Sequence, residues 1–168
     1  MIKRKGALTS MIKVLFVCLG NICRSPMAEA IFRDEIAKKN LTEKVLVDSA
    51  GTAAWHTGKP PHEGTKQILD ENNISYENMK ARQIKQSDFT HFDYIIAMDD
   101  QNVKDIKNEF VVSKNVIFKK LTDLIENPSV KNVPDPYFTG DFDFTYELVQ
   151  QGVQNLSEKI IQNMEKSD

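Results

Sequence analysis

The residues best suited to chemistry lie together in one short segment, 18–25. Cys18 supplies a thiol, and Arg24 follows after five intervening residues with a guanidinium that can form two parallel hydrogen bonds to one anion. Gly20 and Asn21 favour a tight turn between them. The spacing of Cys, five residues, Arg and then Ser therefore predicts a loop that closes around an anion with sulfur at its base.

The elements on either side of this loop explain how it would bind an anion. An apolar run over 13–17 predicts a buried strand before it, and a helical pattern begins directly after it. Ser25 is predicted to cap that helix, with Pro26 at its first position. Loop and helix N–H groups then point to one spot that the helix dipole makes favourable for negative charge. The predicted phosphate-binding residues are Leu19, Gly20, Asn21, Ile22, Cys23, Arg24 and Ser25.

We call residues 18–25 the phosphate cradle. Cys18 is its predicted nucleophile. A thiol at a helix N-terminus beside a cation has a lowered pKa, and the resulting thiolate can attack phosphorus. A lone cysteine at a strand end is more often buried packing, so the assignment depends on its spacing to Arg24. The sequence does not match other phosphate-binding motifs. Gly58 and Lys59 precede Pro60 rather than the Ser or Thr of a Walker A loop, and G-x-G-x-x-G is absent.

An acid that could complete the reaction is Asp135. A thiolate does not expel a poor leaving group unless a proton reaches that group in the transition state. Asp135 lies between Pro134 and Pro136, which restrict the backbone, and aromatic Tyr137 and Phe138 follow. Asp-Pro is otherwise an ordinary turn, so Asp135 becomes the leading candidate only because the Cys18 loop is present.

The elements that would position these residues alternate along the chain between strands and helices. Strands are predicted over 13–17, 45–47, 94–97 and 116–118, and helices over 25–38, 64–71, 99–108 and 142–164. This alternation predicts an α/β domain with a mainly parallel sheet covered on both faces. Ligands in such folds bind beyond the carboxyl ends of the strands, where the loop 18–25 would lie.

Composition excludes several classes of protein. The chain has 168 residues with 22 basic and 24 acidic side chains, a balance that favours neither nucleic acid nor an anionic membrane as partner. Two cysteines cannot form a disulfide scaffold. His56, His62 and His91 have no metal-ligand spacing and are interpreted as solvated loop positions, so we expect no metal and no cofactor.

The amino-terminal residues differ from the rest of the chain. Residues 1–10 are basic and lack the apolar core of a signal peptide, so we expect a flexible extension of 1–10 before a single domain of 11–168. Met11 is an alternative start. Free thiols and the missing signal predict a cytoplasmic protein.

Five segments, 14–26, 48–52, 80–83, 92–95 and 135–137, resemble the low-molecular-weight protein tyrosine phosphatase family. The resemblance implies a flavodoxin-like three-layer sandwich with a four-stranded parallel sheet. It implies hydrolysis of phosphotyrosine in proteins, and of small aryl phosphates, through a cysteinyl-phosphate intermediate without metal. Phosphate and other oxyanions would inhibit. Cys18 would be the nucleophile, Arg24 the transition-state clamp and Asp135 the general acid.

The resemblance also implies residues that support the loop. Asn21 would brace it through hydrogen bonds that include Ser49, and the Ser25 hydroxyl would stabilise the thiolate. Many relatives place a His before the Lys-Ala-Arg segment to support this Asn, whereas Met79 stands here. We therefore expect a different brace on Asn21.

Substrate choice is expected to depend on the walls of the pocket. Trp55 resembles the aromatic residue at the pocket mouth of relatives, and Tyr137 and Phe138 would lie opposite. Arginine-specific members of the superfamily carry Thr at the position of Ile22, so Ile22 favours phosphotyrosine over phosphoarginine.

Two questions stay open at this level. Cys23 could form a reversible disulfide that guards Cys18, as the resemblance implies, or could simply be a small apolar residue behind the loop. A non-catalytic phosphate-binding module would not need Cys18 or Asp135, and an arsenate reductase would need further cysteines. We expect a monomer, with a weak dimer as the alternative.

Overall fold

A four-stranded parallel sheet in the order β2-β1-β3-β4 forms the centre of the computed structural model, which describes residues 11–167. Its strands are β1 (Ile12–Cys18), β2 (Val45–Gly51), β3 (Tyr94–Ala97) and β4 (Ile117–Lys120). This order, with β1 beside both β2 and β3, is that of flavodoxin-like folds. The predicted fold class is confirmed.

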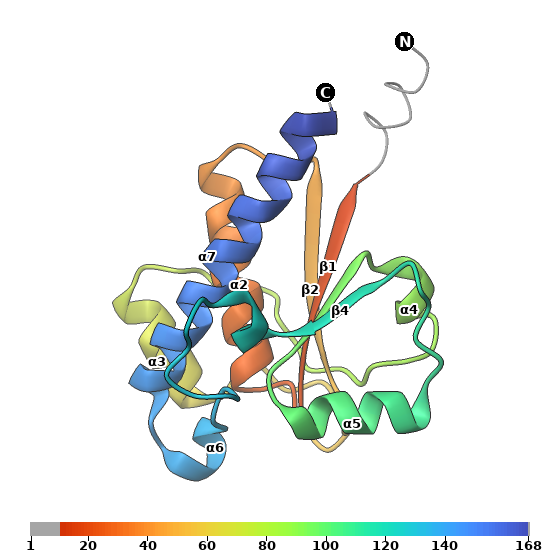
Figure 1. The fold of residues 1–168 in the computed structure, drawn as a ribbon. Coiled ribbons are helices and arrows are strands. Elements are labelled where there is room, and N and C mark those ends of the chain that lie inside the picture. Colours follow the sequence, from red (N-terminus) through yellow and green to blue (C-terminus); the bar gives the residue numbers. More distant parts are fainter. Residues whose placement is uncertain (1–10, 168) are drawn as a thin grey trace.

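Helices cover both faces of the sheet, which gives three layers (Figure 1). One face carries α2 (Arg24–Lys38), α3 (Glu63–Glu71) and the long α7 (Phe142–Ser167). The other carries α4 (Asp88–His91) and α5 (Asp100–Glu109). Two separate apolar cores result, one on each side of the sheet.

Strand β1 lies between the two cores because every second side chain points to the opposite face. Val14 and Phe16 belong to the core under α2 and α7, whereas Leu15 and Val17 belong to the core under α5. All four are fully buried. The ring of Phe16 packs edge-on against that of Phe32 of α2, with the ring centroids 5.8 Å apart. This double burial explains why β1 is a continuous apolar run.

The edge strands differ from the predictions. β2 continues to Gly51 rather than ending at Val47, and β4 covers Ile117–Lys120 instead of 116–118. β4 is only half-buried, and its last two residues are lysines, which protect a sheet edge from pairing with another chain. The bounds predicted for β4 are therefore wrong, because a half-buried strand lacks the continuous apolar run of a strand buried on both faces.

Three short helical segments were not predicted. They are α4, the 3-10 helix η1 (Leu121–Leu124) and α6 (Pro136–Thr139), each of four residues. One turn of helix is too short to display the periodicity of apolar residues on which the predictions rest. The longer helices were predicted to within a few residues at their ends.

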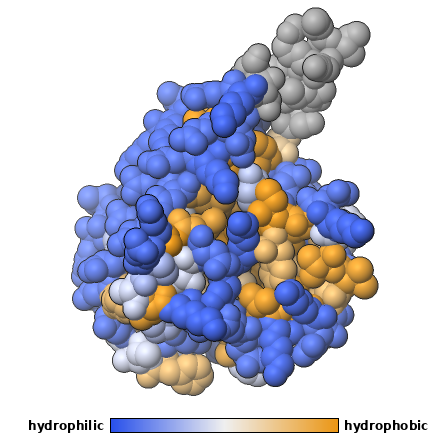
Figure 2. Space-filling model, in the orientation of Figure 1, coloured by the Kyte–Doolittle hydropathy of each residue, from blue (hydrophilic) through white to orange (hydrophobic). Residues whose placement is uncertain are grey.

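The surface is mainly hydrophilic over α7, whereas apolar side chains gather on the side of α5 and β4 (Figure 2). Exposed Val111 and Ile117 lie in the connection from α5 to β4 and at the start of that strand. Within residues 11–167, no helix has the length and apolar character that crossing a membrane requires. The predicted extension, 1–10, lies outside the described residues.

Candidate active site

The loop between β1 and α2 lies at the carboxyl end of the sheet, at the lower end of the view in Figure 1. Gly51, at the end of β2, permits a close approach, because a Cβ there would lie 2.8 Å from the Leu19 carbonyl oxygen. Asn21 takes the left-handed conformation, with φ 58°, which Asn tolerates better than most residues. The sequence thus turns the loop tightly at Asn21 and holds it against β2.

Three groups surround the sulfur of Cys18, which is only 2% exposed. The backbone N–H groups of Asn21 and Ser25 donate to Sγ at 3.3 and 3.4 Å, and the Ser25 hydroxyl oxygen lies 3.0 Å away. These hydrogen bonds hold the sulfur at the base of the loop. Burial and the nearby Cys18 raise the pKa of the second thiol in the loop, that of Cys23, to about 12.

Ser25 does not cap α2 as predicted. The helix begins at Arg24, its N-cap position is Cys23, and no side chain caps it. The Ser25 hydroxyl instead lies beside Cys18 and accepts a hydrogen bond from Asn21 Nδ2. A serine at this position predicted a cap from local sequence, but tertiary contacts within the loop occupy its hydroxyl.

Arg24 is buried, with 1% of its surface exposed, and its guanidinium is held from several sides. Nη1 donates to Asp99 Oδ2 at 2.6 Å and to the Val133 carbonyl at 3.0 Å, and Nη2 donates to Asp135 Oδ2 at 3.2 Å. Burial opposes the charge, but the anionic groups of Cys18, Asp135 and Asp99 raise the pKa of Arg24. Nε is buried without a hydrogen-bond partner among the described residues, so it can donate to an oxyanion.

Asn21 connects the loop to its surroundings. Its Nδ2 donates to the hydroxyl oxygens of Ser25 at 2.7 Å and Ser49 at 2.9 Å, and its Oδ1 accepts from the backbone N–H of Arg82 at 2.9 Å. Met79, which replaces the His of many relatives, is 7% exposed and belongs to the main apolar core. The Arg82 backbone therefore contributes a brace that the sequence did not reveal.

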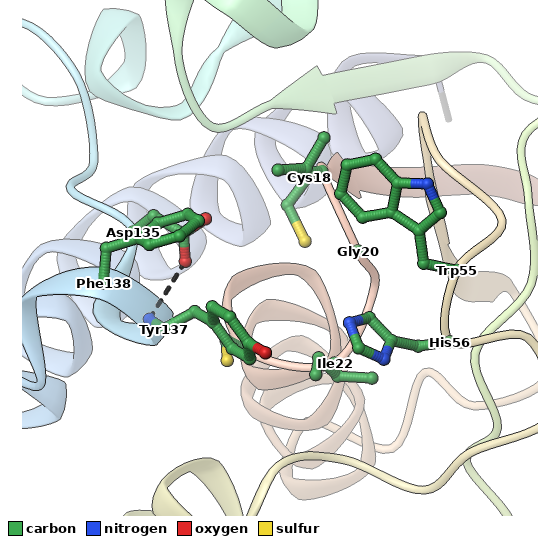
Figure 3. Close-up of a pocket in the computed structure, with 10 residues that line it drawn as sticks. Cys18, Gly20, Ile22, Trp55, His56, Asp135, Tyr137 and Phe138 are labelled. Atoms are coloured by element: carbon green, nitrogen blue, oxygen red, sulfur yellow. Dashed lines mark hydrogen bonds between the residues drawn. The ribbon is translucent and has the colours of Figure 1, made fainter.

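Asp135 lies at the N-cap of the short helix α6. Its Oδ1 accepts from the Tyr137 backbone N–H at 3.1 Å (Figure 3). Its Oδ2 contacts Arg24. Gly140 caps the helix at its carboxyl end, with a left-handed φ of 77° that suits glycine. Asp135, the predicted acid, therefore lies beside the phosphate cradle although it is 117 positions from Cys18 in the sequence.

A cavity of about 270 Å³ opens above the cradle. Figure 3 shows Cys18 with its sulfur directed into this space, Trp55 and His56 on one side, and Tyr137 and Phe138 on the other. The lining residues are Cys18, Leu19, Gly20, Ile22, Cys23, Trp55, His56, Asp135, Tyr137 and Phe138. The predicted nucleophile, acid and pocket walls therefore share one cavity.

The family model described as low molecular weight phosphotyrosine protein phosphatase matches residues 13–166. The chain belongs to this family. The low molecular weight protein-tyrosine-phosphatase YfkJ of Bacillus subtilis is 51% identical over 146 residues, which are 87% of this chain and 94% of YfkJ.

Two further comparisons agree. The low molecular weight protein-tyrosine-phosphatase PtpA of Staphylococcus haemolyticus is 46% identical over 153 residues, covering 91% of this chain and 96% of PtpA. The crystal structure of Bacillus subtilis YfkJ superposes with a TM-score of 0.88 at 49% identity, covering 92% of this chain and 97% of that one. The predicted family and enzyme class, a protein tyrosine phosphatase, are confirmed.

Three positions in or beside the site of this phosphatase are not recognised from the sequence. His56, interpreted as a solvated loop residue, is half-buried and lines the pocket, and His62 is half-buried at the N-cap of α3. Asp99, which binds Arg24, is the N-cap residue of α5 and forms a capping box with Asn102. The Asp-x-x-Asn spacing signals the cap, but no local pattern signals the contact with a residue 75 positions away.

Proposed function

We propose that this family member hydrolyses phosphotyrosine in proteins, and small aryl phosphates, with Cys18 as nucleophile. The Cys18 thiolate attacks phosphorus, so that an S–P bond forms and the bond from phosphorus to the phenol oxygen breaks. Asp135 gives its proton to the departing oxygen. The products of this step are the dephosphorylated tyrosine residue of the substrate and a cysteinyl-phosphate.

The second step restores the enzyme. Water attacks phosphorus, the ionised Asp135 takes a proton from that water, and the S–P bond breaks to release phosphate and the thiolate. Loop N–H groups and the Arg24 fork stabilise the charge on the equatorial oxygens in both transition states. No step requires a metal.

One observation supports this assignment above all others, namely the convergence of three groups. The Cys18 sulfur accepts from two backbone N–H groups, and the Arg24 guanidinium contacts Asp135 at 3.2 Å. The nucleophile and the acid therefore line one cavity although the acid is 117 positions from Cys18, and the buried Arg24 contacts the acid. Nε of the same guanidinium has no partner among residues 11–167, so it can donate to a phosphoryl oxygen.

The pocket walls support an aryl substrate. Trp55, Tyr137 and Phe138 are 70%, 52% and 74% exposed, so their rings are available to a flat phenyl group and its neighbours. Ile22, 8% exposed, adds an apolar surface beside the loop. These features favour phosphotyrosine over phosphoarginine, whose guanidinium would need polar partners.

Three of our expectations remain proposals. Cys18 and Cys23 are both free thiols, and a reversible disulfide between them would protect the nucleophile from further oxidation. Free thiols also suit the reducing cytoplasm, where we place the protein. We expect the enzyme to act as a monomer.

The test is hydrolysis of a phosphotyrosyl peptide in EDTA by the wild type, by Cys18→Ser and by Glu35→Gln, a partly exposed position on α2 that serves as control. Cys18→Ser should reduce kcat by at least about 10⁴-fold, because a hydroxyl is a far weaker nucleophile than a thiolate. Acid quenching of the wild type during turnover should trap one phosphate on Cys18. Metal dependence, or an active Cys18→Ser variant, would refute the mechanism, and faster release of phosphate from phosphoarginine would refute the substrate.

A further inference from the structure

A buried carboxyl group lies at the far end of the hydrogen bonds that support the Cys18 loop. Glu29 of α2 is 8% exposed, and its Oε1 accepts from the Ser49 hydroxyl at 2.6 Å. Ser49 Oγ accepts from Asn21 Nδ2 at 2.9 Å, and the same amide donates to Ser25 Oγ at 2.7 Å. Ser25 Oγ lies 3.0 Å from Cys18 Sγ. A continuous chain thus links Glu29 to the nucleophile.

The direction of the protons in this chain follows from its geometry. The Arg82 backbone N–H binds Asn21 Oδ1, so the amide must present its two N–H groups to Ser49 and Ser25. Because Ser49 Oγ already accepts from Asn21, its single proton goes to Glu29. The Ser25 proton can go to Cys18 Sγ at 3.0 Å or to the Ala50 carbonyl oxygen at 3.5 Å, and the shorter contact favours Cys18. The donors therefore point outward from Asn21, toward Glu29 at one end and Cys18 at the other.

The surroundings of Glu29 compensate a negative charge poorly. Among residues 11–167, Glu29 forms no ion pair. The charged groups around it are Asp48 of β2, Arg33 of the same helix, and Arg82. Arg82 is itself paired with Asp48 and with Asp88 of α4, and Arg33 donates to the carbonyl oxygens of residues 75 and 77.

Both forms of Glu29 are consequently accessible near neutral pH. Burial raises the pKa of the carboxyl to about 7, although the hydrogen bond from Ser49 works in the opposite direction. The carboxylate can only accept, which holds the Ser49 proton toward it. The carboxylic acid can donate to Ser49 Oγ, which must then turn its own proton away from Glu29 while it still accepts from Asn21.

We propose that Glu29 is a positioning residue of the phosphatase, whose carboxylate keeps Ser49, Asn21 and Ser25 directed as donors and whose protonation loosens that order at Cys18. The proposal rests on the function proposed above, because it concerns the reactivity of the same nucleophile. Its consequence is a dependence of Cys18 reactivity on a second ionisation, in a group that never contacts the substrate.

Two variants separate the ionisation of Glu29 from its connection to the loop. Glu29→Gln keeps an acceptor oxygen for Ser49 but does not titrate. Ser49→Ala keeps the carboxyl but breaks the chain between Glu29 and Asn21. Glu35→Gln, on the same helix but partly exposed and paired with Lys39, is the matched control.

The first measurement follows the carboxyl directly. Carbon-13 NMR of the glutamate side chains between about pH 5 and about pH 9 should show one carboxyl titrating near 7 in the wild type, and that signal should be missing in Glu29→Gln. It should persist in Ser49→Ala, in Glu35→Gln and in Cys18→Ser. If no glutamate titrates near 7, the proposal is overturned whatever the role of Cys18.

The second measurement is the rate at which iodoacetate alkylates Cys18 over the same pH range, with the site identified by mass spectrometry. The wild type and Glu35→Gln should show an extra step of about 3- to 10-fold near pH 7, with the faster rate on the alkaline side. Glu29→Gln and Ser49→Ala should both lack this step. An unchanged step in either variant would overturn the proposal, whereas hydrolysis by Cys18→Ser would instead overturn the proposed function and leave the titration in place.

Discussion

The phosphate cradle, residues 18–25, and the aromatic rim, formed by Trp55, Tyr137 and Phe138, border the same cavity but are built differently. Six of the eight cradle residues are buried, whereas the rim side chains are 52% to 74% exposed. Cradle atoms are fixed by hydrogen bonds to β2, to Arg82 and to each other. The part that handles phosphate is thus rigid, while the part that meets the rest of the substrate can vary without cost to the fold.

After Cys18, Arg24 should give the largest effect, because it belongs to the cradle and also contacts the segment that carries Asp135. Arg24→Lys keeps a positive charge but loses the planar fork that can bind two phosphoryl oxygens. We expect kcat for an aryl phosphate to fall by about 10³-fold. Steady-state kinetics on a variant with an unchanged circular dichroism spectrum would measure this. A loss below about tenfold would show that charge alone suffices and that the cradle is less rigid than its contacts imply.

Asp135→Asn tests proton donation by Asp135, which lies between the cradle and the rim. The amide oxygen can still accept from the Tyr137 N–H, but the side chain can no longer give a proton to the leaving group. We expect kcat to fall by about 10²- to 10³-fold for phosphotyrosine, and by less for aryl phosphates whose phenols are more acidic. A series of aryl phosphates measures that gradient. An equal loss across the series would mean that Asp135 acts through structure rather than through its proton.

The sequence predicts a region well when its contacts join residues that are close together in the chain, and poorly when they join residues far apart. The cradle is encoded locally, because a strand, a turn at Gly20 and Asn21, and a helix start are consecutive in the chain. The family resemblance supplied the Asn21 partner, Ser49, which a reading of local sequence could not. Such partners lie on other strands and follow only from the sheet order.

Contacts made by backbone atoms and by buried charges were hidden from the sequence. The Arg82 N–H that braces Asn21 carries no side-chain signature, and Glu29 looks like an ordinary helix residue until its burial is known. The same holds for Asp99, whose carboxylate both caps α5 and binds Arg24. Tertiary geometry gives these groups roles that residue type and spacing do not specify.

Glu29 allows the interior of the cradle to be probed through stability. Burial raises the pKa of this carboxyl from 4.5 to about 7, so the folded state binds the proton more tightly than the unfolded state. The stability gained from the protonated form is complete below about pH 4.5 and is lost as the pH rises through about 7. That loss amounts to about 3 kcal/mol at most.

Glu29→Gln should remove this part of the pH dependence. Denaturant unfolding at about pH 5 and about pH 8 should show a smaller fall in the free energy of unfolding for Glu29→Gln than for the wild type or Glu35→Gln. If all three proteins lose stability equally between the two pH values, Glu29 is ionised throughout, and the interior of the cradle tolerates the charge.

A substitution in the rim should give the smallest effect, and that effect should be on substrate binding alone. Phe138 is 74% exposed and its ring contacts Tyr137 at a centroid distance of 5.2 Å. Phe138→Ala should change the free energy of unfolding by less than about 0.5 kcal/mol, because little buried surface is lost. KM for a phosphotyrosyl peptide should rise by about 3- to 10-fold at constant kcat, since an exposed ring contributes equally to ground-state and transition-state binding. Val111→Ala, at a position 77% exposed on the side of α5 and β4, should change neither quantity. A fall in kcat for Phe138→Ala would mean that the rim positions Asp135 as well as the substrate, and the division between a rigid cradle and an independent rim would then fail.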